Sequence, residues 1–382
     1  MKIALFTDGI HPYVVGGMQR HSYYLAKYFS LKGVQVDLYH TTFRGEKTND
    51  FKLLHCFSDA EKQRIRSVSI DFPEFSSGPG HYLRESYVYS CRVYEAFRVA
   101  PPVDFVYAKG FTGWKFIEEK IKGNEKNKIG VNFHGYEMFQ KSPSVRSKLE
   151  QVFLLRKPVL YNARNADFVF SYGGKITELI SRLCSGKNKI LEIPSGIERS
   201  WITEAPRYPE KRRKFVFLGR YERRKGIEEL NASLQELIRK NDFEFHFVGN
   251  ILERKRVISD KIFYHGEITD SIQLRELLRS CDVLVCPSHS EGMPNVILEA
   301  MASGLAIIAS DVGAIDLMVS KENGWLLEES SKSKISEAIS KAIHFPDKEL
   351  MKLKETSIKK VREEFVWDRI IDTTINAIRK CL

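Results

Sequence analysis

Short apolar runs alternate with longer amphipathic stretches along this chain. Residues 2–6 form an apolar run that predicts a buried strand, residues 19–31 have helical spacing, and residues 35–39 predict a second strand. A strand, a helix and a strand in this order predict a β-α-β unit with parallel strands. Further strands are predicted at 105–107, 129–133, 168–170 and 189–193, with helices that include 83–98 and 146–165.

The alternation is interrupted at Pro194-Ser-Gly-Ile-Glu198, and the polar stretch that follows to Lys214 is typical of an interdomain linker. A second series then begins, with predicted strands at 215–218, 243–248, 262–264, 282–286 and 305–309. The sequence therefore predicts an α/β protein with two Rossmann-like domains, residues 1–196 and residues 197–366. Ligands of open α/β sheets bind beyond the carboxyl ends of the strands, so we expect a site in the cleft between the domains.

The length and composition are those of a folded protein. A chain of 382 residues can form two domains with their own cores, and 43% of the residues are apolar and 29% charged. Asp8 follows only five uncharged residues, and the apolar stretch 300–320 contains Asp311 and Asp316, so we expect neither a signal peptide nor a membrane span. Six cysteines without a C-x-x-C spacing favour a reducing cytoplasm.

The net charge of +11 is concentrated in the first half, where residues 1–200 hold 30 Lys and Arg against 20 Asp and Glu. This asymmetry indicates an anionic partner for the N-terminal domain, such as a phospholipid surface or a lipid diphosphate acceptor. A solvated basic face is the alternative. Nucleic acid is not expected, because no helix-turn-helix, zinc-finger spacing or aromatic RNA-binding motif is present.

Two glutamates eight positions apart, Glu291 and Glu299, are the strongest candidates for chemistry. The run 281–287 predicts a buried strand before them, Pro294 fits the first turn of a helix, and Glu299 falls in the second turn. Backbone N–H groups at this helix start suit a diphosphate, and carboxylates accept hydrogen bonds from sugar hydroxyls. The alternative is a capped surface helix. The donor-binding candidates at the turn are Gly292, Met293, Pro294 and Asn295.

The segment from Glu291 to Glu299 resembles the E-x7-E signature of retaining glycosyltransferases of family 4, also called glycosyltransferase group 1. Four further segments agree with the resemblance and lie in the expected order: Gly16-Gly17, His134-Gly135, Gly219 to Gly226, and Gly313. The resemblance implies the GT-B architecture, in which two Rossmann-like domains face each other across a cleft. It also implies that a C-terminal helix, about residues 367–382, crosses back to the first domain.

The resemblance assigns roles to individual residues. Arg220 and Lys225 resemble a clamp for the donor diphosphate, Glu291 would bind hydroxyls of the transferred sugar, and His134 would contact that sugar. These four are the expected catalytic residues. Donor contacts are expected from Gly16, Gly17, Gly219 and Glu299, the last through the ribose hydroxyls. We interpret Arg223 and Arg224 as a solvated turn, and Glu137 as either an acceptor contact or a helix cap.

No Asp-x-Asp and no paired histidine spacing occur, so we expect no metal and no cofactor beyond the nucleotide sugar itself. The glycine pair does not match G-x-G-x-x-G, which argues against a nicotinamide dehydrogenase.

The expected protein is a retaining, metal-independent hexosyltransferase that takes a hexose from a UDP-sugar or another nucleotide sugar. Its acceptor would be a saccharide or a lipid-linked acceptor in cell-envelope polysaccharide or glycolipid synthesis, in the cytoplasm or at the inner face of the membrane. Two alternatives remain: a nucleotide-sugar-binding subunit without catalysis, and another GT-B enzyme such as a sugar-nucleotide epimerase or a phosphorylase. Residues His265-Gly266 do not distinguish uracil from guanine.

Overall fold

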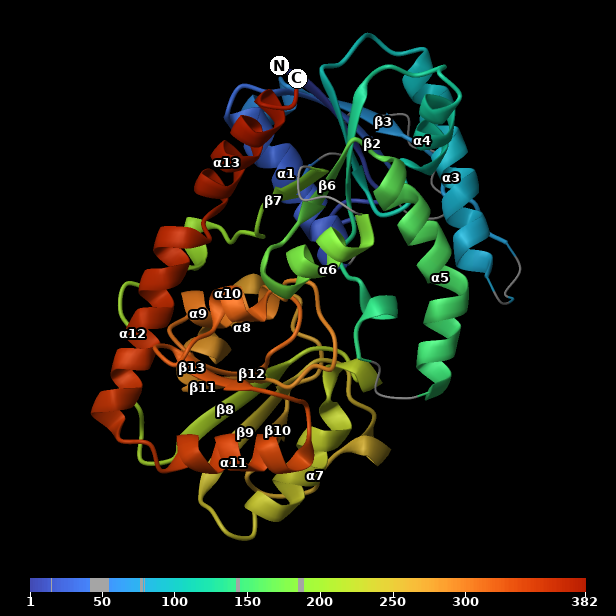
Figure 1. The fold of residues 1–382 in the computed structure, drawn as a ribbon. Helices are drawn as coiled ribbons and strands as arrows, with labels where there is room; N and C mark the ends of the chain where they lie inside the picture. The colour runs from blue at the N-terminus through green and yellow to red at the C-terminus, as the bar shows by residue number, and fades with distance from the viewer. Residues whose placement is uncertain (15, 42–54, 76–77, 79, 142–144, 185–188) are drawn as a thin grey trace.

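The computed structural model describes residues 1–14, 16–41, 55–75, 78, 80–141, 145–184 and 189–382, without the side chains of 145–153. Two parallel β-sheets lie one above the other, each covered by helices (Figure 1). The upper sheet has the strand order β3-β2-β1-β4-β5-β6-β7 and the lower sheet β10-β9-β8-β11-β12-β13. This is the predicted α/β architecture of two Rossmann-like sheets.

The strands of the first sheet all precede the predicted linker. They are β1 (Lys2–Phe6), β2 (Gln35–His40), β3 (Ile65–Ser69), β4 (Phe105–Lys109), β5 (Lys128–Asn132), β6 (Phe168–Ser171) and β7 (Ile190–Glu192). The second sheet contains β8 (Arg213–Leu218), β9 (Phe243–Val248), β10 (Ile262–Tyr264), β11 (Val283–Cys286), β12 (Ala306–Ser310) and β13 (Gly324–Leu327).

Two strands, β3 and β13, were not predicted from the sequence. Both lie at the edge of a sheet, and their sequences, IRSVS and GWLL, lack a strong apolar run or a clear alternation. These segments are strands because of their pairing with a neighbour: β3 is in register with β2 over five residues, and β13 with β12 over four.

Helices fill the connections between the strands. In the first half they are α1 (Gly17–Leu31), α2 (Asp59–Lys62), α3 (His81–Arg98), α4 (Trp114–Ile121), α5 (Val145–Asn165) and α6 (Gly174–Cys184). In the second half they are α7 (Ile227–Leu237), α8 (Ser271–Ser280), α9 (Asn295–Ala302), α10 (Ile315–Met318), α11 (Lys332–Ile343), α12 (Asp347–Glu364) and α13 (Trp367–Arg379). The predicted helices 83–98 and 146–165 correspond to α3 and α5.

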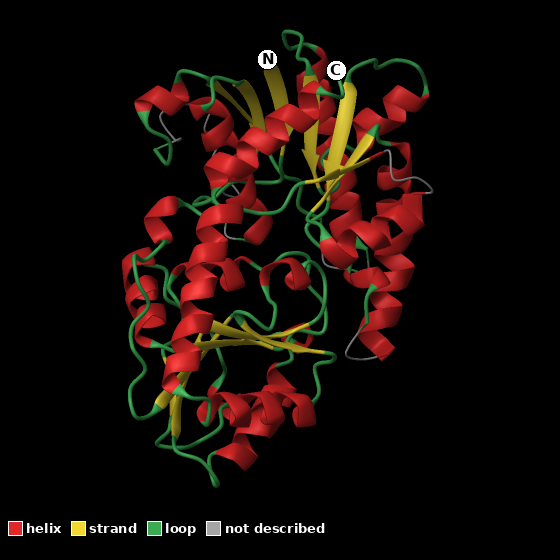
Figure 2. Ribbon diagram, turned by 60° about the vertical axis from the view of Figure 1, so that its left-hand side comes forward, coloured by secondary structure: helices red, strands yellow, loops and turns green. Residues whose placement is uncertain are grey.

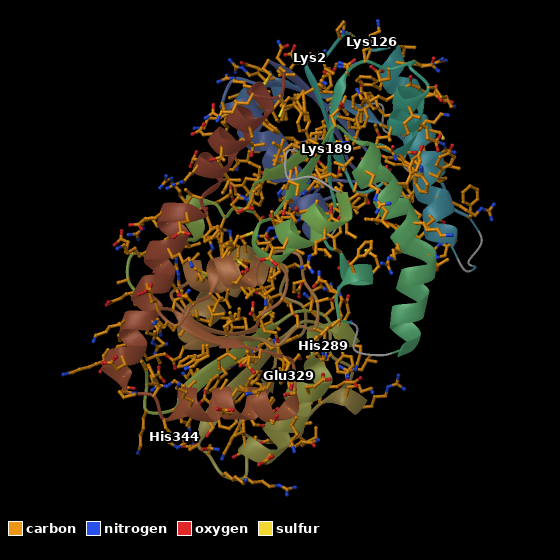
Figure 3. All side chains as sticks on the ribbon, in the orientation of Figure 1. Lys2, Lys126, Lys189, His289, Glu329 and His344 are labelled. Atoms are coloured by element: carbon orange, nitrogen blue, oxygen red, sulfur yellow. The ribbon has the colours of Figure 1, made fainter. Side chains whose placement is uncertain are left out.

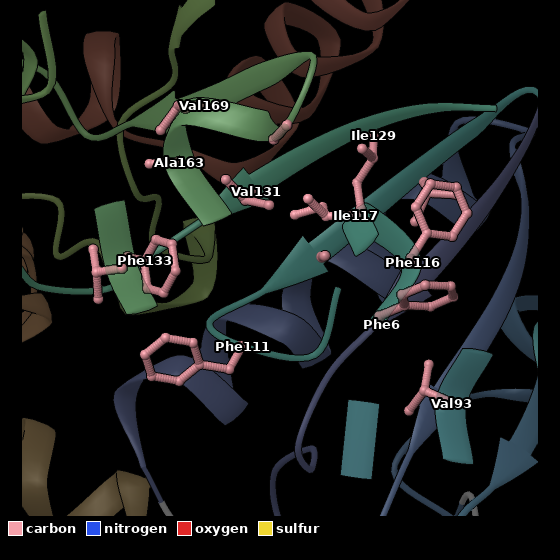
Figure 4. Packing of buried hydrophobic residues seen from close by; sticks show 14 of the residues in the cluster. Phe6, Val93, Phe111, Phe116, Ile117, Ile129, Val131, Phe133, Ala163 and Val169 are labelled. Carbon is pink, nitrogen blue, oxygen red and sulfur yellow. The ribbon is translucent and has the colours of Figure 1, made fainter. Parts of the chain in front are cut away.

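Apolar side chains from strands and helices form the cores. On one side of the first sheet, Phe6, Phe116 and Val131 pack with residues of α3 and α4 (Figure 4). The rings of Phe6 and Phe116 meet edge to face, with centroids 6.2 Å apart, a favourable geometry for aromatic pairs. This core holds β1, β4 and β5 rigidly, and the loops at their carboxyl ends are therefore well positioned.

The last helix returns to the first sheet, as the resemblance implies. Helix α12 runs along the lower half and α13 lies beside α1 at the top, close to both chain ends (Figures 1 and 2). Trp367, Ile371 and Ile378 of α13 are buried in the same cluster as Ile3 and Leu5 of β1. Burying such large apolar side chains gives on the order of 2 kcal/mol each, so α13 is firmly attached to the N-terminal half.

The chain crosses between the two halves at two adjacent places. The linker residue Ile197 and the segment before α13 form a parallel bridge, in which Ile197 N–H donates to Phe365 O at 2.7 Å and Trp367 N–H donates to Ile197 O at 3.1 Å. Gly196 lies against Trp367, whose ring a Cβ at that position would crowd. The two crossings therefore form one hinge on one side of the molecule.

Within the residues that the structure describes, no helix is both long enough and apolar enough to cross a bilayer.

Candidate active site

Glu291 lies on the loop between β11 and α9, which the labelled His289 marks in Figure 3. The buried carboxylate accepts a hydrogen bond from Ser288 Oγ at 2.8 Å and forms an ion pair with Lys225, whose Nζ is 2.5 Å from Oε1. Arg224 lies 3.4 Å from Oε2. Burial alone would raise the pKa of Glu291, but Lys225 and Arg224 hold it below its usual value. Glu291 is therefore ionised at neutral pH and held between two cations.

Glu299 lies in the second turn of α9, as predicted, but it is not on a surface. Its residue is 3% exposed, and its carboxylate forms an ion pair with Arg20, a residue of α1 in the N-terminal half. The negative charge of Glu299 raises the pKa of Arg20 above its ordinary value. The guanidinium also lies over the ring of Trp201 in the linker, at 5.6 Å. The ion pair therefore joins the two halves beside the hinge.

The basic loop after β8 contains Arg223 and Arg224, which we interpreted from the sequence as a solvated turn. Arg223 forms ion pairs with Glu228 and Glu229, and Arg224 pairs with Glu222 in addition to Glu291. The two side chains, 36% and 29% exposed, are thus partly solvated and also paired with carboxylates, so the choice between a solvated turn and a clamp stays open.

Arg220 and Lys225, the two expected clamp residues, are placed differently from each other. The Arg220 side chain is 80% exposed and pairs with Glu222 at 2.8 Å, whereas Lys225 is largely buried against Glu291. Gly219 directly follows β8 and precedes Arg220, and a Cβ added at Gly249 would collide with its carbonyl oxygen. The structure thus brings Lys225 to Glu291, whereas Arg220 is exposed and paired with Glu222.

The loop of Glu291 is pressed against the N-terminal half. Gln140 donates from Nε2 to the carbonyl oxygen of Glu291 at 2.9 Å and accepts from its backbone N–H at 3.3 Å. A Cβ added at Gly292 would collide with the carbonyl oxygen of His134. Gly313, with φ of +64°, packs in turn against the carbonyl oxygens of Glu291 and Gly292. Glycine is therefore required at 292 for the two halves to touch here, and at 313 for the close packing of two loops within the C-terminal half.

His134 follows β5 and faces this contact from the N-terminal side. Its Nδ1 forms a short hydrogen bond with the hydroxyl of Tyr172, and its ring meets that of His21 edge to face with centroids 5.4 Å apart. Burial, followed by the nearby Lys109, lowers the pKa of His134 well below its usual value, so the imidazole is neutral. Its buried Nε2 has no hydrogen-bond partner among the described residues.

The start of α9 is less open than the sequence predicts. Pro294 is the N-cap residue, one position before the first helical turn, and residues 291–294 are all buried. The linker residue Ser195 covers this end, since its N–H approaches Met293 Sδ at 3.1 Å and its hydroxyl lies 3.1 Å from Asn295 Oδ1. A diphosphate could reach these N–H groups only after the linker moves.

Gly16 and Gly17 lie at the N-terminus of α1, as expected for a glycine pair after the first strand. Gly17 begins the helix and has open space on its Cβ side, whereas a Cβ at Gly16 would meet the side chain of Gln19. Glu137 begins a 3-10 turn (Glu137–Phe139) after β5, and a Cβ at Gly135 would collide with its carboxylate. The choice between an acceptor contact and a cap for Glu137 stays open.

Several residues at the site carried no local signal. Arg20, Gln140 and Tyr172 contact Glu299, Glu291 and His134, but each is an ordinary helix, turn or strand-end residue in the sequence. Arg20 lies 279 positions from Glu299. The one available signal is position, because these residues follow closely on β1, β5 and β6, the strands whose carboxyl ends meet at the cleft.

In the described part of the chain, no His, Cys, Asp and Glu side chains gather in a group that could hold a metal ion. Metal independence itself stays a prediction.

The fold and this constellation define a class: a protein of GT-B architecture, with acidic and basic side chains of one domain facing a histidine of the other. Solved structures agree. Sucrose-phosphate synthase from Thermosynechococcus elongatus is similar over 100% of this chain and 98% of its own, with a TM-score of 0.76 and 19% identity. Anabaena HepE, solved in complex with UDP-glucose, covers both chains fully with a TM-score of 0.67 and 15% identity.

Residues 212–344 match the family described as Glycosyl transferases group 1. A putative teichuronic acid biosynthesis glycosyltransferase, TuaC of Bacillus subtilis, is 28% identical over 188 residues, which are 47% of this chain and 48% of TuaC. The chain therefore spans about half the length of this relative. The similarity to the group 1 glycosyltransferase family therefore lies in residues 212–344, in the C-terminal half of the chain.

Proposed function

We propose that this chain is a retaining glycosyltransferase that transfers a hexose from a nucleotide sugar, with UDP-sugars as the first candidates. The observation that carries the proposal is the cluster of Glu291, Lys225 and Arg224, which faces His134 across the contact between the two halves. The UDP-glucose complex of HepE supports a UDP-sugar donor. The name of TuaC supports an acceptor in cell-envelope polysaccharide synthesis, either a saccharide or a lipid-linked acceptor.

The reaction requires the bond between the anomeric carbon and the diphosphate oxygen to break, which places negative charge on the leaving diphosphate. Three cations could neutralise that charge: Lys225, Arg224 and the exposed Arg220. One such interaction commonly stabilises a transition state by about 3 kcal/mol. We propose that the acceptor hydroxyl attacks from the same face and passes its proton to the leaving phosphate, which retains the anomeric configuration. No metal ion has a role in this scheme.

Both glutamates are occupied by protein cations in the free chain. Glu291 binds Lys225 and Arg224, and Glu299 binds Arg20. Donor binding would therefore exchange partners: the diphosphate takes over the cations of the basic loop, while sugar hydroxyls replace them at Glu291. Ribose hydroxyls would likewise compete with Arg20 for Glu299. Such an exchange pairs the cations of the basic loop with the diphosphate, and hydroxyl hydrogen bonds keep either carboxylate from being buried alone.

The test is a thermal-shift panel of UDP, GDP, ADP and their sugar conjugates in the presence of EDTA. One nucleotide series should stabilise the wild type, by about 2.7 kcal/mol at 100 times its dissociation constant. Lys225→Met should lose this shift. Lys240→Met, which removes an exposed lysine of the same half that pairs only with Glu236, should keep it.

Turnover is then followed with the nucleotide that binds, and the anomeric configuration of the product is read by NMR. A product of inverted configuration contradicts retention, and loss of turnover in EDTA contradicts metal independence. Binding without turnover against a panel of saccharide and lipid-linked acceptors would favour a non-catalytic subunit. No binding by any nucleotide would overturn the proposal.

We further propose that the N-terminal half meets an anionic membrane surface, where a lipid-linked acceptor would be found. Exposed apolar side chains lie on α3 and α5, and a Cβ at Gly80, just before α3, would contact Leu154 of α5. Tyr82, Phe75 and Leu154 are all exposed, and Arg84 lies over the ring of Phe75 at 5.1 Å.

The test is flotation with phosphatidylglycerol vesicles, with which the wild type should float. The double substitution Tyr82→Ser and Leu154→Ser should lower the fraction of protein that floats. Equal flotation with neutral vesicles would contradict the electrostatic part of the proposal.

A further inference from the structure

A chain of buried polar groups runs from the interior of the first sheet to His134. Lys109, the last residue of β4, is fully buried, and its Nζ donates to Asn132 Oδ1 and lies 3.1 Å from His21 Nδ1. Asn132, at the end of β5, is next to the hydroxyl of Tyr172, which contacts His134 Nδ1. The ends of three adjacent strands, β4, β5 and β6, together with α1 therefore supply one connected network, and buried networks of this kind are costly unless each member is satisfied.

The orientation of Asn132 is determined by its surroundings. Its Nδ2 donates to the carbonyl oxygen of Phe170 at 3.2 Å, so Oδ1 faces Lys109 and Tyr172. The opposite orientation would place two oxygens together on one side and an NH₂ group against the lysine on the other. Burial lowers the pKa of Lys109 well below its usual value, yet even a neutral amine has two N–H groups for its two acceptors. Asn132 Oδ1 is therefore already served by Lys109.

The single proton of the Tyr172 hydroxyl then decides the state of His134. The hydroxyl is within donating distance of two acceptors, Asn132 Oδ1 at 3.2 Å and His134 Nδ1, which is much closer. Because Lys109 already donates to Asn132, the tyrosine proton is free to go to the nearer acceptor, His134 Nδ1. A neutral imidazole that accepts at Nδ1 carries its own proton on Nε2. The backbone of Gly17, at the glycine pair, acts to raise the pKa of His134, as a carbonyl facing a ring N–H does.

We propose that Tyr172, held by the Lys109–Asn132 pair, is a positioning residue that fixes His134 as the tautomer protonated at Nε2. The buried Nε2 is then a hydrogen-bond donor that lies near the backbone of Gly17, although no described residue accepts from it within hydrogen-bond distance. A neutral donor at this place suits an oxygen of the nucleotide sugar, on the hexose or on the diphosphate. This last step rests on the proposed function, whereas the tautomer of His134 does not.

The direct test is nitrogen NMR of the free protein with ¹⁵N-labelled histidine, in which His134→Gln assigns the signals. The expected spectrum near neutral pH shows a protonated Nε2 and a bare Nδ1. Tyr172→Phe should abolish the single tautomer and give averaged signals. Tyr136→Phe makes the same chemical change at a buried tyrosine whose hydroxyl has no partner among the described residues, and it should leave His134 unchanged.

A sharper variant is Lys109→Met. Without the lysine, Asn132 Oδ1 is a buried acceptor that has lost its donor, and we expect it to accept the hydrogen bond from the Tyr172 hydroxyl instead. His134 must then donate from Nδ1 to Tyr172, so the tautomer reverses and Nε2 becomes bare. Lys354→Met removes the buried lysine that pairs with Asp282 in the other half, and it should leave the His134 signals unchanged at a similar cost in stability.

A wild-type spectrum with the proton on Nδ1 would overturn the proposal, as would an unchanged His134 tautomer in both Tyr172→Phe and Lys109→Met. If the protein transfers a sugar, Lys109→Met should lower kcat/KM by roughly 10²-fold, the usual cost of one lost donor in a transition state. Lys354→Met should keep the wild-type value. Absence of any transfer by the wild type would refute the proposed function and leave the tautomer result standing.

Discussion

The ion pair between Arg20 and Glu299 allows a quantitative prediction about how the two halves are held together. The Glu299 side chain is 4% exposed and that of Arg20 is 29% exposed. Arg20→Leu would leave a buried carboxylate without a counter-charge, and breaking a buried pair in this way costs about 3–5 kcal/mol. Because Arg20 is partly solvated, we expect the lower part of that range, about 3 kcal/mol.

The reverse substitution should cost less. In Glu299→Leu the remaining charge is the guanidinium, which keeps access to water and stays over the ring of Trp201. The double variant removes both charges and should be closer to the wild type than Arg20→Leu is, because apolar residues often replace a buried pair at little cost. The resulting coupling energy between the two positions should be about 2 kcal/mol.

The assay is urea unfolding of the four proteins in a double-mutant cycle, followed by tryptophan fluorescence. Trp201 and Trp367 lie at the hinge and report on this contact. Lys32→Leu is the matched control, since Lys32 is the C-cap residue of α1 but pairs with the exposed Asp372, and such surface pairs contribute less than about 1 kcal/mol. A cost for Arg20→Leu no larger than that of Lys32→Leu would refute the reasoning.

Three further predictions concern the same region. Gly292→Ala should separate the two halves at the carbonyl oxygen of His134. The linker should then be cleaved faster in limited proteolysis, and an unchanged cleavage rate would contradict the close approach. Burial raises the pKa of Asp8 from 3.8 to about 6, so the folded state loses stability as the pH rises from about 4 to 6. Asp8→Asn should therefore increase the free energy of unfolding by about 2–3 kcal/mol at pH 7.5 but change it little at pH 4. Urea unfolding at both pH values would show the difference. The pKa of Glu291 is lower in the folded state than the value near 4.5 of the unfolded state, so the ionised carboxylate stabilises the fold above that pH and this stability is lost as the pH falls. Lys225→Met should move this loss of stability to higher pH, as unfolding curves taken from pH 3 to 7 would show.

The sequence by itself determined the order of most strands and helices and the loops at which the candidate site residues lie. Alternating apolar runs are a local signal, and they located eleven of the strands now seen, including β8 and β11, whose following loops hold Gly219 and Glu291. Glycine is also a local signal where it marks a close approach, as at Gly292 and Gly313. The two edge strands were missed because their pairing with a neighbour, rather than their own pattern, makes them strands.

Only the tertiary structure decided which charges meet. Arg20 reaches Glu299 from the other half, Arg224 pairs with Glu291 from the loop after β8, and Tyr172 contacts His134 across two strands. These pairings depend on how the two sheets face each other and on the return of α13 to α1, which bring together residues far apart in the chain. Local periodicity has no information about such contacts, because an amphipathic helix or an exposed arginine looks the same in the sequence whether water or a buried carboxylate lies opposite.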